Sequence, residues 1–277
     1  FPSDIQRKVD MSVKLIFVDV DDTLYSKRTR KVADSARTAL KKAQQNGHKV
    51  LINTGRPMAY FEKEILDLGF DGYLCSNGQY IMIDDQLVYH QTFPKDTLEA
   101  VMEACKKYHI FGTLEGDQCS YFRNHDIDFH PHYGFMIQAF DLEPEMPHEF
   151  SWDNADSCEK IIVFGGEGSD VPGFLKELDR FRDVLDYITI DDTQFEILVK
   201  GHNKATGLEE AVKYYQTSLE NCYAFGDSNN DTEMIQTAGH GIAMGNACDE
   251  LKEIADYITT DIDEDGISHG LKHFHLI

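Results

Sequence analysis

The sequence predicts an α/β protein whose parallel sheet is interrupted by a second, α+β unit. Three observations support this. Near both ends of the chain, short apolar runs alternate with amphipathic helical patterns, which is typical of parallel strands joined by helical crossovers. In the middle of the chain, strand patterns come in neighbouring runs, which favours an antiparallel sheet. The first apolar run, residues 15–18, ends directly in carboxylates, as expected where open α/β sheets bind their ligands.

The first part of the chain alternates strand and helix. Residues 15–18 form a short apolar run like those of strands buried on both faces. A helix is expected at 35–45, closed by Asn46-Gly47, followed by a strand at 49–53. The next helix is predicted at 58–68, with Pro57 at its first position, and the next strand at 73–75.

The middle of the chain has a different pattern, and the first pattern then returns. Expected strands of the middle region lie within 80–93, 111–123, 160–164 and 187–200, and its expected helices at 95–108 and 171–181. The last part predicts helices at 204–215, 231–237 and 249–255, with strands at 222–225 and 241–244. We therefore predict a core made of residues 11–85 and 191–277, and an inserted domain at 86–190. Residues 1–10 carry no pattern and are interpreted as an expression remnant before Met11.

Composition narrows the classes of function. The formal net charge of −23 argues against nucleic acid and anionic membranes as partners. No apolar stretch approaches the roughly 20 residues of a membrane span. The six cysteines are widely spaced and form no Cys-x-x-Cys pair, which is typical of a reduced, cytoplasmic protein. The acidic composition predicts nothing about oligomeric state.

The carboxylates after the first strand predict a cation site. Asp19 and Asp21 stand one residue apart, and closely packed carboxylates repel each other unless a cation or a proton lies between them. This predicts Mg²⁺, which in proteins usually acts on phosphate. Three further polar clusters follow other predicted strands or open a helix. These are Thr54-Gly55-Arg56, an anion site at a helix start, Lys204, and the pair Asp227 and Asp231.

Taken in order, these four clusters resemble the motifs of the haloacid dehalogenase-like (HAD) hydrolases. They are Asp19-Val20-Asp21-Asp22-Thr23, Thr54-Gly55-Arg56, Lys204, and Gly226-Asp227-Ser228-Asn229-Asn230-Asp231. Their spacing resembles the Cof-type phosphatases, which carry a large type IIB cap between the second and third motifs. The segments 76–78 and 259–266 are similar to further signatures of that branch. Asp22 stands where Gly is commoner, and Asn53 where Ala is common.

The resemblance implies a Rossmann-like HAD core with an inserted α+β cap, and a role for each motif residue. Asp19 would be the nucleophile and Asp21 the general acid and base, with a pKa raised by neighbouring carboxylates. Thr54 and Lys204 would hold the phosphoryl oxygens. The expected substrate-binding residues are Thr54, Gly55, Arg56, Asn77, Lys204 and Asn230. The expected Mg²⁺ residues are Asp19, Asp21 (through its main-chain carbonyl), Asp227 and, through water, Asp231.

The predicted function is Mg²⁺-dependent hydrolysis of small phosphorylated metabolites, including sugar phosphates, through an aspartyl-phosphate. A large cap that encloses the leaving group argues against protein and nucleic-acid phosphoesters. Two alternatives remain at this point: a phosphomutase on the same scaffold, and a binding protein without turnover. Cap residues would set specificity, and Phe122, Arg123 and His125 are the candidates that the sequence offers.

Overall fold

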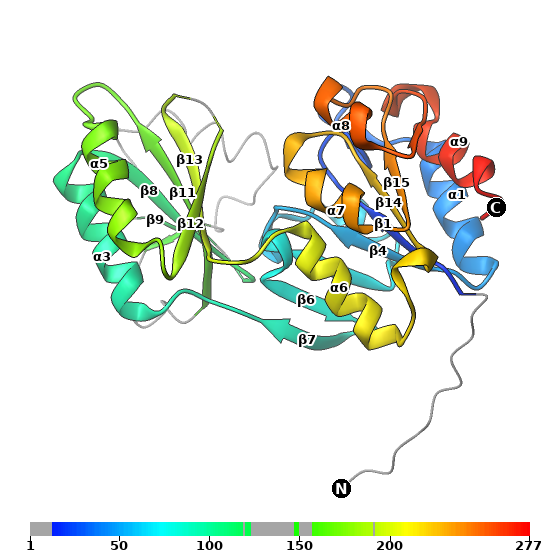
Figure 1. The fold of residues 1–277 in the computed structure, drawn as a ribbon, viewed down its shortest axis with the longest axis horizontal. Coiled ribbons are helices and arrows are strands. Elements are labelled where there is room, and N and C mark those ends of the chain that lie inside the picture. Colours follow the sequence, from blue (N-terminus) through cyan, green and yellow to red (C-terminus); the bar gives the residue numbers. More distant parts are fainter. Residues whose placement is uncertain (1–12, 119, 123–146, 150–156, 191) are drawn as a thin grey trace, which may run out of the picture.

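The computed structural model describes residues 13–118, 120–122, 147–149, 157–190 and 192–277. Two sheets, each with its own helices, lie side by side, and two stretches of chain connect them (Figure 1). The first described residues, from Val13, and the C-terminal end of the chain both lie in the unit that carries the larger sheet. The predicted fold class, a parallel-sheet core with an inserted α+β unit, is confirmed.

The larger sheet belongs to the core. Its strands are β1 (Leu15–Val18), β4 (Lys49–Asn53), β5 (Gly72–Cys75), β6 (Tyr80–Ile83), β7 (Gln86–His90), β14 (Cys222–Gly226), β15 (His240–Ala243) and β16 (Tyr257–Ile258). They are ordered β16-β15-β14-β1-β4-β5-β6-β7. All pairs from β16 to β5 are parallel, and β6 and β7 extend the sheet as an antiparallel hairpin. The strand β1, which carries the first motif, therefore lies near the centre of the sheet.

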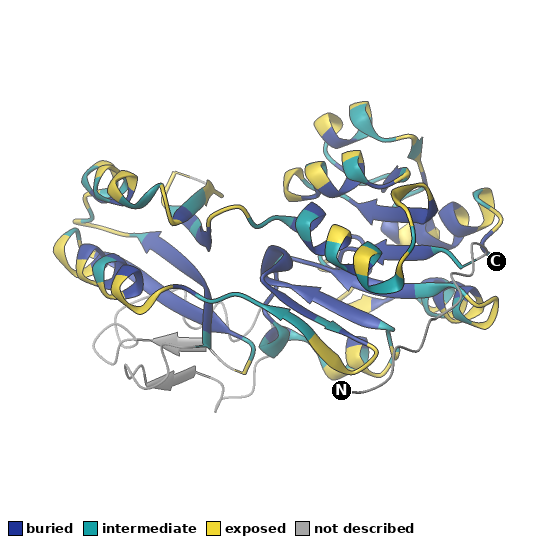
Figure 2. Ribbon diagram, turned by 60° about the horizontal axis from the view of Figure 1, so that its bottom comes forward, coloured by how far each residue is buried: buried dark blue, intermediate teal, exposed yellow. Residues whose placement is uncertain are grey.

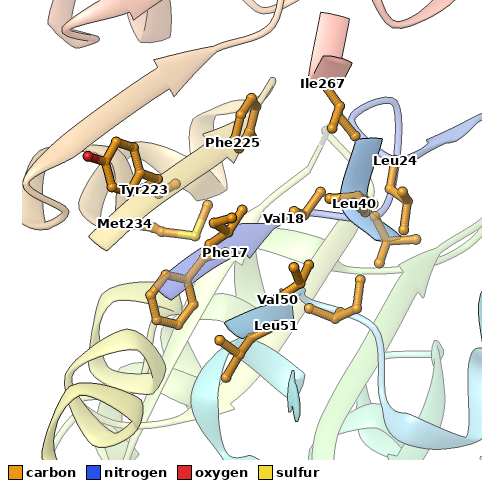
Figure 3. Close-up of a cluster of buried hydrophobic side chains, with 14 of the residues drawn as sticks. Phe17, Val18, Leu24, Leu40, Val50, Leu51, Tyr223, Phe225, Met234 and Ile267 are labelled. Atoms are coloured by element: carbon orange, nitrogen blue, oxygen red, sulfur yellow. The ribbon is translucent and has the colours of Figure 1, made fainter. Parts of the chain in front are cut away.

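Helices cover both faces of this sheet, which is why its strands are apolar on both sides. The core helices are α1 (Asp34–Gln45), α6 (Lys204–Tyr215), α7 (Thr232–Thr237), α8 (Asp249–Ile254) and α9 (Gly266–His273). Val18 packs toward Leu40 of α1 and Ile267 of α9, while Phe17 lies on the other side of β1 (Figure 3). All four residues of β1 are buried. None of the helices in the described part of the chain combines the length and apolar character needed to cross a membrane.

The second sheet forms the cap. It contains β8 (Ile110–Gly116), β9 (Ser120–Phe122), β10 (Pro147–Glu149), β11 (Cys158–Gly165), β12 (Leu185–Thr189) and β13 (Gln194–Val199). The strands are ordered β10-β9-β8-β11-β13-β12 and are antiparallel except for the pair β9 and β10. Helices α3 (Lys95–Lys107) and α5 (Val171–Leu178) cover the face that points away from the core (Figure 1). A separate hydrophobic cluster fills the space between these helices and the sheet, and the outer helix faces are exposed (Figure 2).

The chain changes sheets later than the sequence predicts. Residues 86–90, assigned to the inserted domain, form β7 and pair with β6 in the core sheet, because the turn at Asp84-Asp85 folds them back as a hairpin. Residues 194–199, assigned to the core, form β13 and pair with β11 in the cap sheet. The two connections therefore run from β7 to α3 and from β13 to α6.

The remaining elements are short. They are the hairpin β2 (Tyr25–Ser26) and β3 (Lys31–Val32), the helix α2 (Lys63–Leu66), and 3-10 turns at Met58–Tyr60, Ser76–Gly78, Asp179–Phe181, Leu219–Asn221, Asn229–Asp231 and Ile262–Glu264.

The helix predicted at 58–68 is wrong. A 3-10 turn and α2 replace it, separated by Phe61 and Glu62 in extended conformation. The break places the Glu62 carboxylate 2.8 Å from Arg56 Nη1, and this buried ion pair takes precedence over local helix propensity.

Candidate active site

Three neighbouring strands bring the first, second and fourth motifs together. β14, β1 and β4 are adjacent and parallel, so their carboxyl ends lie at the same edge of the sheet. Asp19 follows β1, Thr54 follows β4, and Asp227 follows β14. All three side chains line one cavity. The strand order therefore brings Thr54 and Asp227, which lie 35 and 208 residues after Asp19 in the sequence, together with Asp19 in a single site.

Lys204 lies below this cavity as the first residue of α6. Asn203 caps the helix, its side chain accepting a hydrogen bond from Thr206 N at 3.0 Å. The carbonyl of Lys204 accepts a hydrogen bond from Asn53 Nδ2 at 2.8 Å. Asn53, where the sequence departs from the family pattern, thus joins the end of β4 to the start of the helix and fixes the position of Lys204.

The ammonium group of Lys204 connects two carboxylates. Its Nζ lies 2.7 Å from Asp19 Oδ1 and 2.6 Å from Asp231 Oδ1, and it also donates to Asn230 Oδ1 at 3.0 Å. Lys204 and Asp231 are fully buried. A lysine with all three protons donated in this way orients its partners rigidly, and it offsets part of their mutual repulsion.

Asp19, Asp227 and Asp231 form the acidic cluster of the site, with ligand oxygens within 4.8 Å of one another. Asp231 is held from both sides, because its Oδ2 accepts hydrogen bonds from the backbone of Asp227 and of Ser228 at 3.0 and 3.1 Å. Asp227 Oδ1 accepts a hydrogen bond from Thr23 Oγ1 at 2.7 Å. The second oxygen of Asp19 and that of Asp227 accept no hydrogen bond from the described residues. These two oxygens are the ones available to a cation.

The ionisation of the acidic cluster fits a divalent cation. Burial raises the pKa of Asp19 to about 8, although the Lys204 charge works in the opposite direction. Burial and the charge of Asp231 raise the pKa of Asp227 to about 7. A cation would remove the cost of keeping both groups ionised, and oxygen ligands of this kind suit Mg²⁺. The donor chemistry therefore fits the predicted ion, with Asp19 and Asp227 as its holders and Asp231 as their support.

The prediction of a raised pKa for Asp21 is wrong. Its carboxylate accepts two parallel hydrogen bonds, from Arg56 Nε and Nη2, each at 2.8 Å. Burial works toward a higher pKa, but the hydrogen bonds and charge of Arg56 outweigh it and lower the pKa of Asp21. The nearest charge is thus a guanidinium and not another carboxylate, and this pairing depends on the turn after β4.

The loop at 76–78 supports the second motif from behind. Ser76, Asn77 and Gly78 all have positive φ, and the Asn77 amide lies beside the Cα of Gly55. A Cβ on Gly78 would lie 2.9 Å from the carbonyl oxygen of Asn203. Only glycine fits where this loop meets the start of α6. The loop therefore sets the distance between the second and third motifs.

The cavity has a volume of about 500 Å³ and lies between the core and the cap. Of the predicted site residues, those that line it are Asp19, Asp21, Thr54, Gly55, Arg56, Asp227 and Asn230. Lys204, Asp231 and Asn77 do not line it and lie beneath. The individual roles assigned to these residues stay predictions.

The sequence reasoning missed the residues that the cap contributes. Glu115, Lys160 and Glu196 line the cavity opposite the motifs. A signal was present, because Glu159 and Lys160 stand directly before the apolar run 161–164 of the same strand. The predicted cap candidates Arg123 and His125 lie outside the described residues, as does the side chain of Phe122.

Comparison with known proteins identifies the family. The family model of haloacid dehalogenase-like hydrolases matches residues 16–271. The chain belongs to the haloacid dehalogenase-like hydrolases. The predicted family and the prediction of an enzyme of this type are confirmed.

Relatives of this hydrolase match along their whole length. A 5-amino-6-(5-phospho-D-ribitylamino)uracil phosphatase of Bacillus subtilis, YitU, is 29% identical over 94% of this chain and 97% of its own. The pyridoxal phosphate phosphatase YbhA of Escherichia coli is 27% identical over 96% of this chain and 100% of its own. The structure of the HAD subclass IIB sugar phosphatase BT4131 superposes with a TM-score of 0.80 at 26% identity, covering 96% and 100% of the two chains.

Proposed function

We propose that this hydrolase is a Mg²⁺-dependent phosphatase of small phosphorylated metabolites. One observation carries the proposal: Asp19, Thr54 and Asp227 meet around one cavity, with Lys204 bonded to the nucleophile from below. The relatives named above are phosphatases of a ribitylaminouracil phosphate, of pyridoxal phosphate and of a sugar phosphate. Their leaving groups differ, so they support the reaction without naming the substrate of this chain. A cytoplasmic location stays a prediction.

In the proposed reaction, Asp19 attacks phosphorus with its Oδ2, which accepts no hydrogen bond from the described residues. The product is an aspartyl-phosphate, and water then cleaves it. Bound Mg²⁺ would supply the positive charge that lets a carboxylate approach a phosphate dianion. Asp19 and Asp227 would hold the ion, with Asp231 oriented toward them by Lys204 and by the backbone of the fourth motif.

Asp21 is the proposed proton carrier. Arg56 keeps it as a carboxylate, which is the form that can accept a proton from the attacking water. In the first step Asp21 must instead donate a proton to the leaving oxygen. Phosphoryl oxygens that enter the cavity compete for Arg56, and weakening the Arg56 pair raises the pKa of Asp21 toward the value that donation needs.

The test is hydrolysis of p-nitrophenyl phosphate, with Mg²⁺ and with a chelator. Turnover is expected only with the ion. Asp19→Asn should lose at least about a thousandfold in kcat. Asp22→Asn makes the same chemical change in the same loop, on a half-exposed side chain, and should keep most of the activity. Normal turnover by Asp19→Asn would exclude Asp19 as the nucleophile.

Two further measurements distinguish the remaining alternatives. Acid-quenched protein should carry one phosphoryl group on Asp19 when substrate is in excess. Inorganic phosphate should be released without any bisphosphate activator. A requirement for such an activator would favour the phosphomutase, and binding of phosphate esters without turnover would favour the non-catalytic protein.

A further inference from the structure

Three charged side chains of the cap form a cluster over the cavity. Lys160 stands on β11 and pairs directly with Glu115 of β8, while Glu196 of the neighbouring β13 pairs with Ile162. All three side chains belong to the face of the cap sheet that looks toward the core, since the opposite face packs on α3 and α5. We call Glu115, Lys160 and Glu196 the cap cluster. It lines the same cavity as Asp19.

Lys160 is buried, and its ammonium group lies among three oxygen atoms. Its Nζ donates to the carbonyl oxygen of Gly55, in the second motif, at 2.9 Å, and to Glu196 Oε1 at 3.3 Å. It also lies 3.2 Å from Glu115 Oε2. Two of the three protons of the ammonium group are therefore donated, and the third side of the group faces the Glu115 carboxylate as an ion pair. A second phosphate or a carboxylate on the ligand would have to approach Lys160 past the carboxylates of Glu115 and Glu196, which repel it.

The glutamates, by contrast, keep acceptor capacity. The contact from Lys160 to Glu115 Oε2 is an ion pair without hydrogen-bond geometry, and this buried oxygen accepts no hydrogen bond from the described residues. A buried acceptor without a donor is costly, and a ligand hydroxyl or amine can supply the donor. Glu196 is only partly buried and reaches the cavity as well.

Charge and shape restrict the ligand further. Two carboxylates surround one ammonium group in the cap cluster, whereas Arg56 and Lys27 lie on the core side of the cavity. The core side also carries Asp19, Asp21 and Asp227, so it would attract a phosphate once Mg²⁺ offsets these carboxylates, whereas a second anion near the cap is repelled by Glu115 and Glu196. The isoleucines Ile188 and Ile190 also line the cavity and are 41% and 49% exposed, which provides an apolar wall.

We propose that the cap cluster selects monophosphates whose leaving group carries no negative charge, has hydroxyl groups facing Glu115 and Glu196, and presents an apolar face to Ile188 and Ile190. Esters with a second phosphate or a carboxylate on the leaving group are rejected. This inference rests on the proposed phosphatase function and names the substrate class of the same site. A site with this selectivity would also reject the bisphosphate activator that a phosphomutase needs.

The first test uses the unmodified enzyme and matched esters. Glucitol 6-phosphate and 6-phosphogluconate differ at the end far from the phosphate, where the second carries a carboxylate. Fructose 6-phosphate and fructose 1,6-bisphosphate form a second pair. We expect kcat/KM to be at least about tenfold higher for the uncharged member of each pair, equivalent to about 1.4 kcal/mol. Equal values, or a preference for the charged member, would overturn the proposal.

The second test assigns the selection to the cap cluster. Glu196→Gln should reduce the preference in both pairs about three- to tenfold, mainly by improving the charged ester. Glu99→Gln makes the same change on the exposed face of α3 and should leave the preference unchanged. If both variants keep the preference of the unmodified enzyme, the cap cluster does not cause it.

Binding to Asp19→Asn separates this inference from the proposed reaction. Calorimetry with this variant measures the dissociation constants of the same esters without turnover. We expect the uncharged member of each pair to bind more tightly than the charged member. If the unmodified enzyme does not hydrolyse p-nitrophenyl phosphate, the proposed phosphatase reaction is wrong. The relative affinities for charged and uncharged esters would still test the proposed selection by the cap cluster. Hydrolysis of p-nitrophenyl phosphate combined with tighter binding of the charged esters refutes the inference and leaves the reaction standing.

Discussion

Replacing Lys204 by methionine removes one positive charge from the acidic cluster and keeps most of the length of the side chain. The ammonium group lies 2.7 Å from Asp19 and 2.6 Å from Asp231, and it is fully buried. At an effective dielectric constant of about 20, each contact corresponds to roughly 6 kcal/mol of attraction. Desolvation of the three charges offsets much of this. Removing one partner of such a buried group costs about 3–5 kcal/mol, because the other charges lose their compensation.

The assay is urea unfolding of the metal-free protein at pH 9, where Asp19, with its pKa of about 8, is ionised, followed by far-UV circular dichroism. Lys204→Met should lose about 3–5 kcal/mol of unfolding free energy. Lys213→Met is the matched control on the same helix, where an exposed lysine pairs with Glu210, and its effect should lie within the error of the measurement. In mildly acidic buffer the difference should shrink, because the carboxylates left by Lys204→Met become protonated. Equal losses in both variants would refute the electrostatic role of Lys204.

Further predictions concern pH and backbone conformation. Asp19 binds its proton more tightly in the folded chain than in the unfolded chain, so the free energy of unfolding of the metal-free protein should fall as pH rises from 3.8 to about 8. Excess Mg²⁺ should remove most of this pH dependence. A free energy of unfolding that does not change with pH in the metal-free protein would contradict the prediction. Gly78→Ala should lose about 3 kcal/mol or more in urea unfolding, whereas Gly47→Ala, which shares a positive φ but meets open space, should lose about 1 kcal/mol. The hydrogen bond that the Glu159 carboxylate accepts from His90 raises the pKa of His90, so this pair stabilises the protein below pH 6.5 and loses its contribution as His90 deprotonates. Glu159→Gln should therefore cost more stability in acid than in alkaline buffer, and a cost independent of pH would argue against a charged pair.

Local patterns predict much of the core. The strand at 49–53 and the helix at 204–215 lie where the sequence places them. Both have strong local signals: an apolar run bounded by polar residues in the first, and an amphipathic face in the second. The site residues Asp19, Thr54 and Asp227 are also predictable as a group, because each follows a predicted strand and parallel strands end at the same edge.

Contacts between distant segments explain the differences. The helix predicted at 58–68 is broken because Glu62 pairs with Arg56, and local propensity contains no information on that pair. The same arginine lowers the pKa of Asp21, where the sequence predicted a rise from neighbouring carboxylates. Asn53 appears in the sequence as a minor departure, and its bond to the Lys204 carbonyl is visible only when β4 and α6 are side by side.

The sequence by itself determined which chemistry this protein can perform, since acidic, hydroxyl and basic side chains at strand ends and at a helix start follow from local order along the chain. Only the tertiary structure decided how those groups ionise and what faces them. Burial and partner charges act through space, so the raised pKa of Asp19, the carboxylate form of Asp21 and the contact of Lys160 with the Gly55 carbonyl depend on segments that are far apart in the chain.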